Sequence, residues 1–127
     1  MQLELEGSLA FITVTLAYQG AHLIVIKVLV DTGAEHTVLA GDVVATINIA
    51  PQPTDLVHTI SGVGGIETVF GRQVDYLQAG DKRLPAFPIQ VGGMDYGFEI
   101  NGILGMDFLI QAGAIINLRE LQIEFAG

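Results

Sequence analysis

The sequence of 127 residues contains no cysteine and no tryptophan, and its only serines are Ser8 and Ser61. Neither serine lies in a nucleophile-elbow pattern, so hydrolysis through a serine or cysteine nucleophile is excluded. The three histidines have no metal-ligand spacing, and the glycines at 62–65 match neither a dinucleotide-binding nor a phosphate-binding loop. We therefore expect no metal and no cofactor.

Positive charge is also scarce. Five basic residues stand against fourteen acidic ones, which gives a formal net charge of −9. This sign opposes binding to a phosphate backbone, so we expect no nucleic-acid partner. The electrostatic field of this negative charge favours binding of neutral or basic peptide segments over acidic ones. The alternative is that the charge serves only to keep the protein in solution.

Long hydrophobic runs are missing as well. The longest one, residues 23–30, is interrupted by Lys27 and is far shorter than the roughly 18 to 20 residues of a membrane span. The first six residues have neither the positive start nor the apolar centre of a signal peptide. We expect a soluble, cytoplasmic protein without a membrane partner.

The composition otherwise indicates a folded β protein. Half of the residues are apolar and 15% are charged, which excludes disorder, and sixteen glycines indicate many tight turns. The length suits one domain, which we place at residues 1–127. The fold class that we expect is all-β.

Patterns of β-branched and apolar residues predict most of the strands. We expect a hairpin of residues 9–16 and 21–30, and a second hairpin within residues 57–70 around a glycine-rich tip. Residues 42–54 read as irregular, with a short strand near 45–49. Further expected elements are strands at 72–78, 84–91, 115–118 and 121–125, and a short helix within 105–113 that has Asp107 in its first turn and Gly113 at its end.

The most informative motif is Asp31-Thr32-Gly33, directly after the apolar Leu29-Val30. The preceding strand would place the Asp31 carboxylate on a loop, and Gly33 would allow a close approach of the backbone to a ligand. A turn aspartate is the alternative reading of Asp31. Peptide hydrolysis by carboxylates needs one base and one acid at the same time, and the motif occurs once, so this chemistry implies two chains.

Further motifs follow in a consistent order. They are residues 37–39 just after the Asp-Thr-Gly motif, the glycine-rich segment 62–65, the apolar block Ile103-Leu104-Gly105 and the closing segment 114–118. Together these motifs resemble the retropepsins, the single-domain aspartic proteases of retroviruses, and their cellular and bacterial relatives. The resemblance covers about residues 23–118.

The resemblance implies a closed β barrel with a flap hairpin and one short C-terminal helix, and a homodimer in which two copies of Asp31 activate a water to hydrolyse a peptide or protein substrate. Thr32 would then bond across the two-fold axis, although an ordinary strand residue is the alternative. Ala34 is similar to the retroviral form of the loop. The residues that the resemblance implies in substrate binding are Leu29, Glu35, His36, Val38, Ile60, Ser61, Gly62, Val63, Gly64, Gly65 and Ile103.

Several positions depart from the retroviral pattern. His36 replaces an aspartate, Met106 replaces an arginine, and Ser61 replaces the first glycine of the flap. Simpler interpretations also exist. His36 is then a surface residue, residues 61–65 form a plain glycine turn, and Leu29, Val38 and Ile103 are core residues. These departures keep a second function open, a dimeric peptide-binding or assembly module with the same fold and little or no catalysis.

Overall fold

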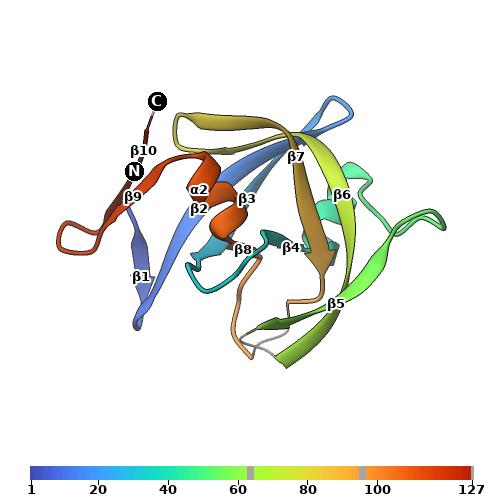
Figure 1. Ribbon diagram of the computed structural model, residues 1–127, viewed down its shortest axis with the longest axis horizontal. Coiled ribbons are helices and arrows are strands. Elements are labelled where there is room, and N and C mark those ends of the chain that lie inside the picture. The colour runs from blue at the N-terminus through green and yellow to red at the C-terminus, as the bar shows by residue number, and fades with distance from the viewer. Residues whose placement is uncertain (63–64, 95–96, 127) are drawn as a thin grey trace.

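The computed structural model describes residues 1–62, 65–94 and 97–126, and for residues 58, 60–62 and 65–67 it describes only the backbone (Figure 1). Strands dominate it, which confirms the all-β class. The elements are β1 Glu4–Glu6, β2 Leu9–Tyr18, β3 Ala21–Val30, β4 Val38–Ala40, α1 Gly41–Val44, the 3-10 helix η1 Ala45–Ile47, β5 Val57–Gly62, β6 Gly65–Ala79, β7 Lys82–Gly92, β8 Gly102–Leu104, α2 Met106–Gln111, β9 Ala114–Asn117 and β10 Gln122–Phe125.

Eight strands form one sheet in the order β1-β2-β3-β8-β4-β7-β6-β5, and β9 pairs with β10 in a separate two-stranded sheet. Because β2 also pairs with β6, the large sheet curls back on itself (Figure 1). Within the described ranges, β1 and β5 each pair with a single neighbour. Instead of a fully closed barrel, the chain therefore forms a curled sheet with two edge strands.

The hairpin of β2 and β3 confirms the first predicted pair of strands. Its turn residues, Gln19 and Gly20, have φ angles of 49° and 85°. Positive φ at both central residues is the geometry of a type I′ turn, whose twist matches that of the two strands. The sequence Gln-Gly thus fixes the register from Tyr18 opposite Ala21 to Val14 opposite Val25, and a shift between Ile12 and Val14 changes it before β3 reaches Asp31.

The strand expected near residues 45–49 is wrong, because this segment continues from α1 into η1. Val44 and Ile47 are buried whereas Ala45 and Thr46 are exposed, which is a helical spacing and not the alternation of a strand. Asn48, with φ 69°, ends the helical turn. The two strands expected on either side of Gly71 are also one: β6 runs through this residue without a break.

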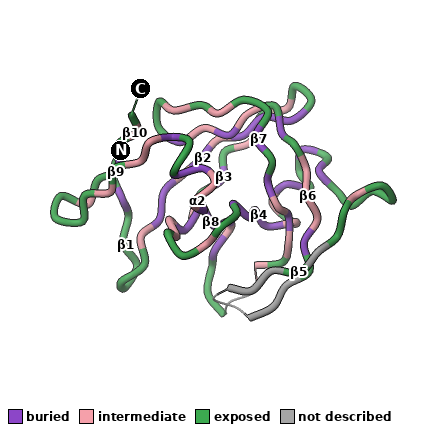
Figure 2. Tube along the Cα trace, viewed as in Figure 1, coloured by how far each residue is buried: buried purple, intermediate pink, exposed green. Residues whose placement is uncertain are grey.

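The core lies inside the curled sheet, where Figure 2 shows buried positions along the inner strands. Helix α2 contributes Phe108, whose ring packs against that of Phe87 with centroids 5.6 Å apart. The predicted helix is confirmed, and Gly113, with φ 61°, follows its end. Among the described residues, no helix has the length and apolar character needed to cross a membrane.

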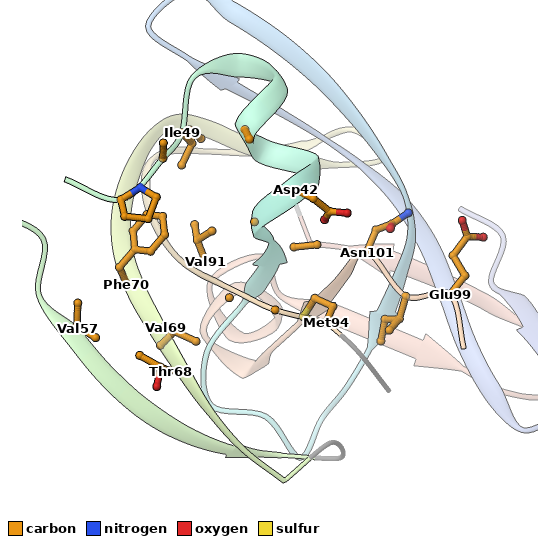
Figure 3. Close-up of a pocket in the computed structure, with 18 of the residues that line it drawn as sticks. Asp42, Ile49, Val57, Thr68, Val69, Phe70, Val91, Met94, Glu99 and Asn101 are labelled. Carbon is orange, nitrogen blue, oxygen red and sulfur yellow. The ribbon is translucent and has the colours of Figure 1, made fainter. Parts of the chain in front are cut away.

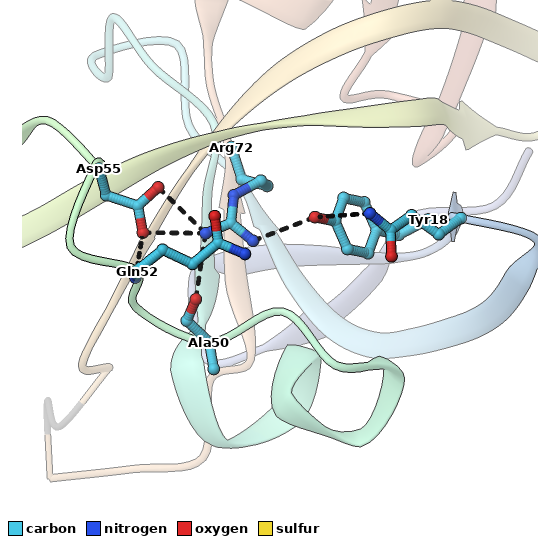
Figure 4. Close-up of polar contacts among 6 residues, drawn as sticks. Tyr18, Ala50, Gln52, Asp55 and Arg72 are labelled. Atoms are coloured by element: carbon cyan, nitrogen blue, oxygen red, sulfur yellow. Dashed lines mark hydrogen bonds and ion pairs between the residues drawn. The ribbon is translucent and has the colours of Figure 1, made fainter.

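An ion pair fastens the segment between η1 and β5 to strand β6 (Figure 4). Arg72 Nη2 lies 2.9 Å from Asp55 Oδ2 and also donates to the Ala50 carbonyl at 3.0 Å. Arg72 Nη1 donates to the Tyr18 hydroxyl at 3.2 Å. Both ionic side chains are only 9% exposed. Burial opposes the charged form of Asp55, but hydrogen bonds from the Gln52 N–H and from Arg72, with the Arg72 charge, keep the pKa of this carboxyl below its ordinary value.

We expect Asp55→Asn to lower the free energy of unfolding at neutral pH. The variant should also lose part of the decrease in this free energy that the wild type shows as the pH falls. Because folding lowers the Asp55 pKa, its contribution is complete above the pKa of an unfolded aspartate, about 4, and is lost as the pH falls through the lower folded value. Urea denaturation of both proteins from neutral pH to about pH 3 measures this loss. Asp81→Asn, at an exposed turn, is the control, and a constant difference between wild type and Asp55→Asn at all pH values would contradict the assignment.

Candidate active site

Asp31 stands at the carboxyl end of β3, where the chain leaves the sheet. Strand β3 pairs in parallel with β8, with Leu29 opposite Ile103 and Val30 opposite Leu104. The Asp31 N–H extends this pairing by donating to the Leu104 carbonyl at 3.1 Å. The half-buried carboxylate is therefore carried by a loop that begins on a rigid strand pair.

The loop after Asp31 holds one carboxylate oxygen and leaves the other without a partner. The Gly33 N–H donates to Asp31 Oδ1 at 2.9 Å, and the Ala34 N–H donates to the Asp31 carbonyl at 3.2 Å. A Cβ on Gly33 would lie 3.2 Å from Asp31 Oδ1, so a side chain there would press on the carboxylate. Among the described residues Oδ2 has no hydrogen-bond donor, and it is available to a water or a ligand.

A second loop, at the start of α2, lies directly against the Asp31 loop. The Met106 N–H donates to the Ala34 carbonyl at 2.8 Å, and the Asp107 N–H donates to the Glu35 carbonyl at 3.1 Å. A Cβ on Gly105 would lie 2.6 Å from the His36 carbonyl oxygen. The glycine in Ile103-Leu104-Gly105 is thus required by the close approach of two backbones.

Thr37 and Asp107 join these two loops from inside. Thr37 is fully buried; its hydroxyl donates to Asp107 Oδ1 at 2.7 Å and accepts from the Gly105 N–H at 3.1 Å. The Thr37 N–H donates to Asp107 Oδ2 at 3.0 Å, and the Phe108 N–H donates to Asp107 Oδ1 at 2.8 Å. The sequence indicates Asp107 only as a residue of the first helical turn, and its bonds to Thr37, seventy residues earlier, are visible only in the folded chain.

The apolar residues proposed from the sequence lie under the loop. Leu29 and Ile103 form a small buried cluster with Phe11 and Ile100, against which Ala34 and Met94 pack. Val38 is buried as well. Their part in substrate pockets stays a prediction, and in this chain they support the Asp31 loop from behind.

The polar residues of the motif face outward. Thr32, Gly33, Glu35 and His36 are exposed, and His36 Nε2 lies 3.8 Å from Glu35 Oε2. In the described part of the chain no three acidic, histidine or cysteine residues gather closely enough to hold a metal ion.

The second hairpin is present as the pair β5 and β6, in which Ser61 faces Ile66 and Gly62 faces Gly65. For Ile60, Ser61, Gly62 and Gly65 only the backbone is described, and Val63 and Gly64 lie outside the described residues. The role of this hairpin as a flap therefore stays a prediction.

Sequence reasoning missed a cavity of 890 Å³ that does not include Asp31 (Figure 3). It lies between α1, the base of the β5–β6 hairpin and the segment that connects β7 to β8. Its walls come from described residues within 40–51, from residue 57, and from residues 68–70, 91–94 and 98–101, and no local pattern links such distant segments. Only the folded arrangement of the sheet reveals it.

The fold and this site define a class: β proteins that carry an Asp-Thr-Gly loop at the end of a strand inside a curled sheet. The family model described as aspartyl protease matches residues 14–108, so the chain belongs to the aspartyl protease family. Its structure is similar to that of a retropepsin-like aspartic protease from Rickettsia conorii, with a TM-score of 0.68 and 18% identity over 97% of this chain and 95% of that chain. This identity shows a common fold alone. No curated protein matches the sequence.

We expect Thr37→Val to destabilise the protein by about 1–3 kcal/mol, because it leaves the Gly105 N–H and Asp107 Oδ1 without their buried partner. Thr37→Ser keeps the hydroxyl and is the matched control. Urea unfolding of the three proteins at neutral pH measures the effect. Equal stability of the valine and serine variants would show that the hydroxyl does not hold the two loops together.

Proposed function

We propose that the protein is an aspartic endopeptidase that acts as a homodimer, with one active site between two copies of Asp31. The observation that carries the proposal is the Asp31 carboxylate itself, which is held by the Gly33 N–H at a strand end and whose Oδ2 has no donor in the described part of the chain. Membership of the aspartyl protease family supports the same reaction. The substrate would be a peptide or an extended segment of a protein.

The chemistry requires two carboxylates in different protonation states. The ionised Asp31 takes a proton from a water while the water oxygen attacks the carbonyl carbon of the peptide bond. The partner's Asp31, protonated, donates a hydrogen bond to the carbonyl oxygen and stabilises the charge that develops there. The partner's Asp31 passes its proton to this oxygen, and a tetrahedral diol forms. The diol then collapses: Asp31 gives the proton that it took from the water to the amide nitrogen, the C–N bond breaks, and the partner's Asp31 takes back one hydroxyl proton, so that a carboxylic acid and an amine leave.

A surface beside the Asp31 loop favours the second copy. A shallow hollow of 280 Å³ is lined by the exposed Thr32 and by apolar residues of α2 and β9, among them the 69% exposed Ile110. In the described part of the chain β9 pairs only with β10, so its other edge can accept a strand. A second copy seated here would cover both features and bring the partner's Asp31 toward the site.

The remaining residues would hold the substrate. The loop residues Thr32, Gly33 and Ala34 would fix the two carboxylates, and the exposed Glu35 and His36 would meet the peptide backbone or its side chains. Residues 60–65 would close over the peptide with backbone donors and exclude water. Leu29, Val38 and Ile103 are buried, and the atoms of these side chains that lie nearest the surface would shape the pockets that receive the side chains of the substrate.

Asp31→Asn should reduce hydrolysis of a mixed peptide library by at least about 100- to 10,000-fold, because an amide cannot take the proton of the water. The amide is nearly isosteric, so the melting temperature and the affinity for a bound peptide should change little. Mass spectrometry of the library measures cleavage. Hydrolysis retained by the purified variant would refute the role of Asp31, and a wild type that binds peptides but never cleaves them would favour the binding module.

Ile110→Glu should weaken dimerisation at least tenfold and reduce activity in proportion, since it places a charge in the apolar hollow beside Thr32. Ile24→Glu is a matched control, because Ile24 is 68% exposed on β3 and Ile110 is 69% exposed on α2. Sedimentation velocity and specific activity over a dilution series measure both effects. A fully active monomer at every dilution would exclude the two-chain site.

A further inference from the structure

The cavity of 890 Å³ has two chemically different ends. Figure 3 shows the carboxylates of Asp42 and Glu99 and the side chain of Asn101 toward one end, and Ile49 and Phe70 toward the other. Its volume lies within the range of sites that bind small ligands or several side chains of a peptide. Such a cavity suits an occupant that is apolar on one side and cationic on the other.

The acidic end is not neutralised by the protein. No lysine, arginine or histidine is found among the described residues that line the cavity. Two basic residues are hydrogen-bonded to residues of the walls, and the charges of both are engaged elsewhere. Arg72, which donates to the Ala50 carbonyl, pairs with Asp55. Lys27, whose backbone carbonyl accepts from the Asn101 N–H, pairs with Glu6 through its ammonium group. Within the described chain, no hydrogen bond or ion pair involves the carboxylates of Asp42 and Glu99, so a cation from outside would meet two free acceptors.

Asn101 adds a third acceptor. Its Nδ2 donates to the Ile26 carbonyl at 3.0 Å, and its backbone N–H donates to the Lys27 carbonyl at 2.9 Å. These two bonds orient the side chain, so its carbonyl oxygen is the group left to accept a hydrogen bond. A guanidinium has five donors in one plane and can bind more than one acceptor at the same time.

The cavity is joined to the proposed active site by packing. Ile100 lines the cavity and belongs to the buried cluster against which Ala34, three residues after Asp31, packs. Met94 also lines the cavity and packs against the same cluster. The cavity and the Asp31 loop therefore share one supporting cluster. This continuity favours the substrate itself over an unrelated ligand.

We propose that this cavity is an accessory site for the substrate, which binds an arginine or lysine and a neighbouring large apolar residue of a segment outside the cleaved bond. The apolar residue packs against Ile49 and Phe70, and the cation reaches Asp42 and Glu99. The proposal rests on the proposed function for the identity of the occupant. The net charge of −9 attracts such a segment from a distance.

The test uses the Asp31→Asn protein, so that the probe is not cleaved, and fluorescence polarisation of a labelled peptide Gly-Phe-Arg-Leu-Gly. A second peptide carries citrulline, the neutral isostere, in place of arginine. Asp42→Asn and Glu99→Gln remove one charge each, and Asp81→Asn and Glu120→Gln make the same changes at exposed positions outside the cavity. Gly93→Phe is designed to fill part of the cavity, since a Cβ on Gly93 meets nothing within 4 Å.

We expect the citrulline peptide to bind about tenfold more weakly, and Asp42→Asn and Glu99→Gln to weaken the arginine peptide about two- to fivefold each, as for exposed ion pairs. Gly93→Phe should abolish binding without a change in melting temperature, and the two control variants should bind as the parent does. Equal binding of the two peptides, or equal effects of the cavity and control variants, would overturn the proposal.

A kinetic arm separates this inference from the proposed function. Appending Phe-Arg-Leu to a peptide that the wild type cleaves should lower KM about tenfold with kcat unchanged, and Asp42→Asn with Glu99→Gln should remove the gain. Hydrolysis without this gain would overturn only the accessory site. Arginine-selective binding without hydrolysis of any peptide would overturn the proposed function and the substrate as occupant.

Discussion

The buried hydrogen bonds between Thr37 and Asp107 are the constraint on which the site geometry depends. They join the loop that follows Asp31 to the start of α2, two segments about seventy residues apart in the sequence. Both Asp107 oxygens accept donors and the Thr37 hydroxyl both donates and accepts, so no buried polar atom of the pair is left unsatisfied. A shift of either loop would break several of these bonds at once, which makes the arrangement stiff.

This stiffness has a direct consequence for Asp31. The parallel pairing of β3 with β8 fixes where the strand ends, and the bonds from Met106 and Asp107 to the carbonyls of Ala34 and Glu35 fix the loop beyond it. The backbone therefore sets the position of the carboxylate, which accepts the Gly33 N–H and no other donor among the described residues. Because the loop is already fixed, the Asp31 carboxylate can meet a water or a ligand without any further ordering of the loop.

The sequence predicted those parts whose signals are local. The Gln19-Gly20 turn, the apolar strand before Asp31 and the helix that ends near Gly113 each carry their own pattern, and each is present. The strand expected near residues 45–49 is wrong because, in so short a segment, the spacing of Val44, Ile47 and Ile49 fits both the period of a helix and the period of a strand. The Thr37–Asp107 link and the large cavity depend on distant segments meeting in the folded sheet, so no window of the sequence contains them.

The negative charge of the chain would have opposite effects at two surfaces: it would oppose dimerisation at the hollow beside Thr32 and favour binding of a cation in the cavity with Asp42 and Glu99. Two copies with a formal charge of −9 each would repel one another, so the proposed dimer would have to associate through apolar contact. No charged residue is among those described around the hollow beside Thr32. At the proposed accessory site, which contains Asp42 and Glu99, the same negative charge would attract a cation. Salt screens both effects: it removes repulsion between the copies and weakens the attraction of a basic segment. If both proposals hold, the proposed dimer would therefore form best at a higher ionic strength than the one that suits binding at the proposed accessory site.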